Sequence, residues 1–385
     1  MEQTITLENV SVKKERNYGI DLLRLISMFM IVGLHVLGQG GILKSVQDLT
    51  FKGEIFWGLE ILFYGAVNVY AIISGYVGYK TKHKATNLIN LCLQMLFFAI
   101  VITGVDLVFA IKNGTAISIK ETILNIFPTI RKYWYFSAYF CLFFFMPLLD
   151  KIIECVSRKT LKIVALFIFI VFCCFTQLYS SVANLNNGYS VLWLGILYLV
   201  GAYFKKYNSL EKWSALKCLL AFIILTILTI ISRSVIGLLT KAVFGEYKLI
   251  NFFVSYTSPT ITLASVFMFT AFTKLKLNKT ANKVIAFLAP MAFGIYVIHC
   301  HPILFAKLNS SFVWITNQPE ILGILLVFAI SLAIFVVCLI IDYLRLLLFK
   351  ICKMDKFAKW IAKVVQGFTN FIFKILKIKL EDDVE

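Results

Sequence analysis

The sequence contains few charged residues. Only 15% of its 385 residues are charged, whereas 60% are hydrophobic, and the mean hydropathy is +0.86. A soluble protein of this length could not cover so much apolar surface, so the composition excludes the soluble globular class. It instead predicts an all-α integral membrane protein, in which helices of about 20 apolar residues cross the bilayer.

Several motifs of soluble enzymes are also absent. The sequence has no Gly-rich phosphate loop, no internal repeat and no segment typical of a soluble catalytic domain. Its nine cysteines are scattered without a Cys-x-x-Cys pair, which predicts small buried side chains and neither a metal site nor a disulfide framework. Any chemistry or transport must therefore take place within the helical bundle.

Acidic residues are outnumbered, with 20 Asp and Glu against 38 Lys and Arg, which gives a net charge of +18. In a soluble protein this excess would indicate nucleic-acid binding. In a membrane protein the cytoplasmic loops are enriched in Lys and Arg, and this positive-inside rule explains the excess without a nucleic-acid partner.

Hydropathy predicts a bundle of about ten transmembrane helices. They cover residues 18–38, 55–79, 88–111, 133–150, 161–180, 189–204, 215–237, 250–274, 284–305 and 320–349. With the N-terminus in the cytoplasm, most basic loop residues lie on the cytoplasmic side. An even number of spans then places both termini there.

The two ends of the chain differ from the bundle. Residues 1–15 are polar without a signal-peptide core, and we expect a disordered cytoplasmic N-terminus. Residues 16–349 form the predicted ten-helix domain. Residues 350–385 form a basic tail, whose apolar residues recur at helical spacing between lysines. This pattern predicts an amphipathic helix bound to lipids at the cytoplasmic leaflet, with docking onto a partner protein as the alternative.

The first span carries ionisable residues on one helix face. Arg24 and His35 are eleven residues apart, so they point within about 20° of the same direction, about 16 Å apart along the axis. Asp21 precedes Arg24 by three residues and shares this face. Ionisable groups within a membrane are costly and mark functional sites. A purely structural ion pair between Asp21 and Arg24 is the alternative.

The depth of each group indicates its role. Arg24 lies towards the cytoplasm and is predicted to anchor an anionic ligand, because a guanidinium binds phosphate through two parallel hydrogen bonds. His35 lies nearer the outer leaflet and is predicted to act as a general base, with a hydrogen bond to another helix as the structural alternative. Glu60 lies at a comparable depth in the second span, where it is predicted to orient the imidazole or to be an interfacial carboxylate.

Other motifs have both structural and functional interpretations. Residues 74–76 (Ser-Gly-Tyr) end the second span with small residues that permit close helix approach. Trp134 and Tyr135 begin the fourth span and fit an aromatic belt at the membrane surface. Residues 299–302 (His-Cys-His-Pro) indicate a broken helix end that lines a cavity. His83 in a basic loop is predicted to be a solvated surface group.

Together these residues resemble a known family. The segment 16–24 (RNYGIDLLR), followed by His35, is similar to the opening motif of the acyltransferase type 3 family. The similarity continues through Ser74-Gly75-Tyr76, Tyr133-Trp134-Tyr135 with Pro147, Gly201 and Gly294-Tyr296-His299, and covers roughly residues 16–345. This chain departs from the family pattern at Asn68, where many members carry an acidic residue, and in its loop lysines, where many carry arginines.

The resemblance implies a ten-span enzyme that moves an acyl group, usually acetyl, from cytoplasmic acyl-CoA to a sugar hydroxyl at the outer face. We therefore expect His35 to be catalytic, and the depth of Glu60 in the second span adds it as a second catalytic residue. The CoA end is expected to be bound by Asp21, Arg24, Lys80, Lys82 and Lys84. The acceptor is expected to be bound by Ser74, Tyr76, Trp134, Tyr135, Tyr296 and His299.

The leading hypothesis is thus a multi-pass O-acetyltransferase of the cell membrane. Acetyl-CoA is the expected co-substrate, no metal is expected, and the expected acceptor is a cell-surface polysaccharide or a lipid-linked glycan precursor. Direct transfer and a covalent acyl-enzyme both remain open, with Ser74 as a conceivable carrier. The alternative is a transporter or flippase for an anionic or sugar solute, with the polar face as its path.

Overall fold

The computed structural model describes residues 16–130, 133–178 and 185–375. The predicted disordered segment 1–15 and the last ten residues of the tail lie outside the described residues. Within the described part of the chain every regular element is a helix, as the composition predicts.

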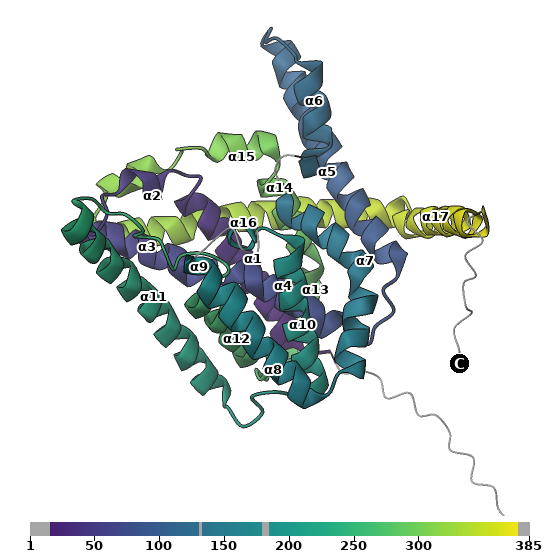
Figure 1. Ribbon diagram of the computed structural model, residues 1–385. Helices are drawn as coiled ribbons and strands as arrows, with labels where there is room; N and C mark the ends of the chain where they lie inside the picture. The colour runs from purple at the N-terminus through teal and green to yellow at the C-terminus, as the bar shows by residue number, and fades with distance from the viewer. Residues whose placement is uncertain (1–15, 131–132, 179–184, 376–385) are drawn as a thin grey trace, which may run out of the picture.

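The helices follow one another along the chain as Figure 1 shows. The α-helices are α1 Tyr18–Leu37, α2 Ile42–Ser45, α3 Phe51–Tyr64, α4 Ala66–Gly78, α5 Ala85–Lys112, α6 Ile119–Ile126, α7 Trp134–Cys155, α8 Arg158–Ile168, α9 Thr176–Leu178, α10 Val191–Tyr207, α11 Ala215–Phe244, α12 Pro259–Thr273, α13 Lys279–Leu288, α14 Ala292–His299, α15 Pro302–Leu308, α16 Glu320–Ile351 and α17 Met354–Ile375. A π-helix, Phe169–Phe175, joins α8 to α9, and short 3-10 turns are Pro128–Ile130, Asn186–Gly188, Ala289–Met291 and Val313–Asn317.

Seven helical segments of the described chain are long and apolar enough to cross a membrane, so the chain has the helices of a membrane protein. They are Tyr18–Ser45, Phe51–Gly78, Ala85–Lys112, Trp134–Cys155, Ala215–Phe244, Lys279–His299 and Glu320–Ile351. Three more predicted spans coincide with α10, α12 and the interrupted α8–α9 segment. The total of ten spans and the cytoplasmic placement of both termini remain predictions.

Helix α1 lies in the middle of the bundle and packs against α3, α4, α12, α14 and α16 (Figure 1). It begins at Asn17, whose side-chain oxygen accepts a hydrogen bond from the backbone N–H of Ile20. The amide nitrogen of the same side chain donates to the carbonyl oxygen of Thr273, 2.9 Å away, at the end of α12. The polar face of α1 is therefore held inside the bundle from its first turn.

Two glycines allow α4 and α10 to approach closely. A Cβ atom on Gly75 of α4 would meet the backbone oxygen of Tyr198, and a Cβ on Gly201 of α10 would meet the backbone oxygen of Ile72. The contact is reciprocal, with each helix placing a glycine against the other's backbone. The structural interpretation of the Ser-Gly-Tyr motif, close helix approach, is therefore what the packing shows.

Asn68 joins the same two helices to the segment before α12. Its amide nitrogen donates to the carbonyl oxygen of Tyr256 at 2.7 Å, and the indole N–H of Trp193 donates to its side-chain oxygen at 3.0 Å. Both ends of this fully buried amide are thus satisfied. A structural cross-link explains why an amide, which both donates and accepts, fits this position.

Two arginines buried in the spans have partners of opposite sign. Arg233 of α11, whose side chain has 0% exposure, forms ion pairs with Asp48 and Glu54 and so ties α11 to the start of α3. In α16, Arg345 pairs with Asp342 at 2.7 Å. An unpaired buried charge is costly, and both sets of pairs avoid that cost. The pairs of Arg233 also join separate segments, whereas Asp342 and Arg345 belong to the same helix.

Helix α17 leaves the bundle at its side and packs against α5 (Figure 1). Several of its large apolar side chains are exposed, namely Phe357, Trp360, Val364, Val365, Phe368 and Phe371. Lysines occupy other positions of the same helix. Its place on the cytoplasmic leaflet remains a prediction.

The α4–α10 contact can be tested with matched alanine substitutions. We expect Gly75→Ala to lower the free energy of unfolding by about 1–3 kcal/mol, because the new methyl group would overlap the backbone of Tyr198. Gly104→Ala in α5 is the control, since nothing lies within 4 Å of its Cβ position, and alanine favours helix by up to about 1 kcal/mol. Thermal unfolding in detergent would show the contrast. Equal melting temperatures for the two variants would contradict the close contact.

Candidate functional site

A cavity of about 710 Å³ lies between α1, α4, α7 and α14, within the size range of small-molecule sites. Arg24 and His35 both line it. The prediction that these two side chains share one face of the first span is therefore confirmed by a common cavity. Eleven residues of helix separate them, so the cavity follows α1 for about 16 Å.

Arg24 is held at one end by an acidic neighbour. Its guanidinium lies 3.1 Å from Asp21, which also accepts from Arg16 at 2.5 Å. The hydroxyl of Tyr70 donates to the backbone carbonyl of Arg24 at 2.8 Å. The ion pair considered from the sequence is present, yet Arg24 also faces the cavity. Two arginines share one carboxylate, so this end of α1 keeps a net positive charge.

His35 meets a second histidine at the other end. Its Nδ1 lies 2.9 Å from Nε2 of His299, and Nδ1 of His299 lies 2.6 Å from the carbonyl oxygen of Ile295. A carbonyl only accepts, so Nδ1 of His299 carries a proton and its Nε2 is an acceptor in the neutral ring. The hydrogen bond between the rings then places the His35 proton on Nδ1 and a lone pair on Nε2. This is the tautomer that a general base requires.

Cys300 completes this cluster. Its Sγ lies 3.4 Å from Nε2 of His299 and 3.7 Å from Nδ1 of His35, and the side chain lines the cavity. The three donor atoms all lie within 4.8 Å of one another, a set that could hold a metal ion. Cysteine spacing could not indicate this cluster, because His299 and Cys300 lie 264 and 265 residues from His35 along the chain.

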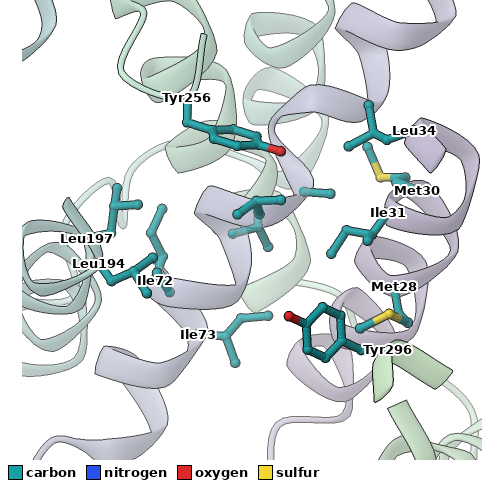
Figure 2. Close-up of a cluster of buried hydrophobic side chains, with 14 of the residues drawn as sticks. Met28, Met30, Ile31, Leu34, Ile72, Ile73, Leu194, Leu197, Tyr256 and Tyr296 are labelled. Atoms are coloured by element: carbon teal, nitrogen blue, oxygen red, sulfur yellow. The ribbon is translucent and has the colours of Figure 1, made fainter. Parts of the chain in front are cut away.

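Aromatic side chains form much of the cavity wall. Figure 2 shows the rings of Tyr256 and Tyr296 between side chains of α1 and those of α4 and α10. The ring centroid of Trp134 lies 4.5 Å from that of Tyr189. Trp134, Tyr135 and Tyr296 all line the cavity, so the first two are not confined to a membrane-surface belt. The hydroxyl of Tyr135 is buried and has no hydrogen-bond partner among the described residues.

The other predicted ligand-binding residues are divided. Ser74 lines the cavity and donates to the carbonyl oxygen of Tyr70 at 2.9 Å. Tyr76, one turn or less further along α4, packs outside the cavity lining, against Phe269 and under the ammonium of Lys205. Lys80, Lys82 and Lys84 lie exposed between α4 and α5. None of these lysines lines the cavity, and their contact with a phosphate remains a prediction.

Glu60 and His83 are placed differently from the sequence hypotheses. Glu60 is buried in α3, is not part of the cavity lining, and its Oε2 has no hydrogen-bond partner within the described chain. Its catalytic role stays a prediction. The prediction of a solvated His83 is wrong: its Nε2 lies 3.0 Å from Asp150, which also accepts from Tyr198 at 2.8 Å. A buried carboxylate near the end of α7 needs such a partner.

The cavity-lining position of the 299–302 segment was expected, but no role was predicted for Cys300 or for four tyrosines of the wall, Tyr70, Tyr139, Tyr189 and Tyr256. The abundance of tyrosine in an apolar chain was the one available signal, but interfacial positions explain it equally well. No local pattern separates the tyrosines of the cavity from the others.

The fold and cavity define an apolar helical membrane protein with charged and polar side chains in a cavity along its central helix. The sequence model of a family described as an acyltransferase domain matches residues 17–343. This match covers most of the chain, which therefore belongs to the acyltransferase type 3 family. No curated protein and no solved structure matches the chain.

The contact between the two histidines can be tested by kinetics. We expect His299→Leu to lower kcat for acyl transfer about tenfold or more, because His35 loses the acceptor that fixes its tautomer. His299→Gln should restore part of the rate, since its amide oxygen can accept the same proton. His301→Gln is the control, because the His301 ring contacts the carbonyl oxygen of Asn125. A rate unchanged in His299→Leu would show that the contact has no part in orientation.

Proposed function

We propose that the protein is a multi-pass O-acetyltransferase of the plasma membrane. In this proposal it moves an acetyl group from cytoplasmic acetyl-CoA to a hydroxyl of a cell-surface polysaccharide or lipid-linked glycan precursor. One observation carries the proposal: a single cavity is lined by Arg24 and, further along α1, by His35, which contacts His299 behind it. An anionic donor needs a cation to bind it, and a hydroxyl acceptor needs a base. The arginine and the histidine supply these two functions at separate places in the cavity.

The arginine end suits the donor. The guanidinium of Arg24 binds phosphate oxygens through a planar fork, and its backbone is fixed by Tyr70. Asp21 holds the side chain in place while Arg16 balances the charge of Asp21. The exposed lysines Lys80, Lys82 and Lys84 add positive charge on the side of the membrane assigned to CoA. The thioester arm of the donor then extends along the cavity towards His35.

The histidine end suits the acceptor. In the proposed reaction, Nε2 of His35 takes the proton of the sugar hydroxyl, and the resulting positive charge is shared with His299 through the 2.9 Å contact. Trp134 and Tyr189 offer ring faces to the apolar side of a sugar. The hydroxyl of Tyr135 is available for a polar contact with the ligand. Water exclusion by the apolar wall protects the thioester from hydrolysis.

Two substitutions test the division of the cavity. With matched membrane levels, we expect His35→Ala to reduce acetyl-CoA-dependent labelling of envelope glycan by about 100-fold or more. Arg24→Ala should act mainly by raising KM for acetyl-CoA about tenfold, because it removes binding to a distant part of the donor. Arg158→Ala, an exposed arginine on α8, is the control.

The same experiment separates the enzyme from the alternative, a transporter or flippase. A transporter would move its solute without consuming the thioester. Wild-type protein that neither consumes acetyl-CoA nor labels glycan would refute the proposed reaction. Full labelling in both variants would remove Arg24 and His35 from the mechanism.

A further inference from the structure

Cys300 is held in the geometry of a nucleophile with a base. It follows directly on α14, and its backbone N–H donates to the carbonyl oxygen of Tyr296 at 3.1 Å. Its sulfur lies 3.4 Å from Nε2 of His299, whose other nitrogen is fixed by Ile295. A nucleophile, a base within hydrogen-bond reach and a third group that orients the base form the arrangement used in covalent catalysis.

The sulfur also faces the place where substrates would meet. Cys300 and His35 line the same cavity, although only 5% of the cysteine is exposed. The buried hydroxyl of Tyr135 lines this cavity too and lacks a partner among the described residues, which indicates a polar ligand at the wall. A thioester that reaches His35 therefore also reaches the sulfur of Cys300.

We propose that Cys300 carries the acyl group as a thioester between donor and acceptor. The inference rests on the proposed function, because it assumes an acyl-CoA donor and a hydroxyl acceptor. The acyl group then moves in two steps, first from CoA to the sulfur of Cys300 and then from that sulfur to the acceptor. Exchange of one thioester for another is close to balanced in energy, so the carrier keeps the acyl group reactive.

Each step balances in atoms and charge. In the first, Nε2 of His299 gives up its hydrogen bond with Nδ1 of His35 and takes the thiol proton of Cys300, and the sulfur attacks the acyl carbonyl carbon of acyl-CoA. The bond from that carbon to the CoA sulfur breaks, and the CoA sulfur takes the proton from the histidine pair. In the second, the acceptor hydroxyl gives its proton to His35 and its oxygen attacks the acyl carbon. The bond to Cys300 breaks, and the proton returns to its sulfur.

Two competing assignments fit the geometry less well. Two nitrogens bound to one tetrahedral zinc at about 2.0–2.1 Å lie about 3.3 Å apart, whereas those of His35 and His299 lie 2.9 Å apart, a hydrogen-bond distance. Ser74 also lines the cavity, but its hydroxyl donates to the backbone carbonyl of Tyr70. A backbone carbonyl oxygen cannot serve as a base for this hydroxyl.

The test uses purified full-length protein in lipid nanodiscs with radiolabelled acetyl-CoA and no acceptor. We expect one label per chain on the peptide containing Cys300, removed by hydroxylamine at neutral pH as a thioester is. We also expect labelled CoA to exchange into acetyl-CoA. Both signals should fall at least about tenfold in Cys300→Ala and persist in Cys338→Ala, a cysteine of matched burial at 4% exposure in α16. Equal melting temperatures would show that both variants are folded.

Other outcomes would overturn the inference. Wild-type protein that transfers acetyl to glycan without label or exchange would use direct transfer. Undiminished transfer by Cys300→Ala would assign the carrier elsewhere. One equivalent of zinc in the wild type, lost in Cys300→Ser, would make the sulfur a metal ligand. Label and exchange without glycan acylation would instead keep the carrier and refute only the acceptor in the proposed function.

Discussion

A polar side chain inside a membrane bundle must find its partner within the protein, and the central helix α1 meets this constraint at both ends. Asp21 lies between two arginines at one end, and His35 contacts His299 at the other. The partners come from the chain just before α1 and from α14, so the contacts that satisfy these groups also position the helices around the cavity. The same hydrogen bonds and ion pairs therefore stabilise the packing of the helices and form the site.

Composition and helical spacing were enough to predict the class of fold and the central feature of the site. Arg24 and His35 fall on one face of any regular α-helix, because they are eleven residues apart. A helix in lipid is regular because its backbone N–H and C=O groups must hydrogen-bond to each other. Their common cavity follows from that rule. The close helix approach at Gly75 could likewise be predicted from the sequence, because small residues in membrane spans favour close contact between helices.

Pairings between distant segments could not be read from local patterns. His299 and Cys300 reach His35 only through the packing of α14 on α1, and a cysteine far from any other along the chain is indistinguishable from a small apolar residue. His83 shows the same limit, since its charged surroundings in sequence indicated solvent while its partner Asp150 lies 67 residues away. Sequence spacing predicts which residues share a face of one helix, whereas the packing of the whole bundle determines which helices are neighbours.

The positive end of the cavity has a consequence for the membrane itself. A cavity that follows a spanning helix for about 16 Å is a potential route for ions across the bilayer. The fixed charge of Arg24, supplemented by Arg16, opposes the entry of sodium ions and hydronium, as a single arginine does in water-conducting pores. The fixed charges of these two arginines thus disfavour the passage of cations along the central helix.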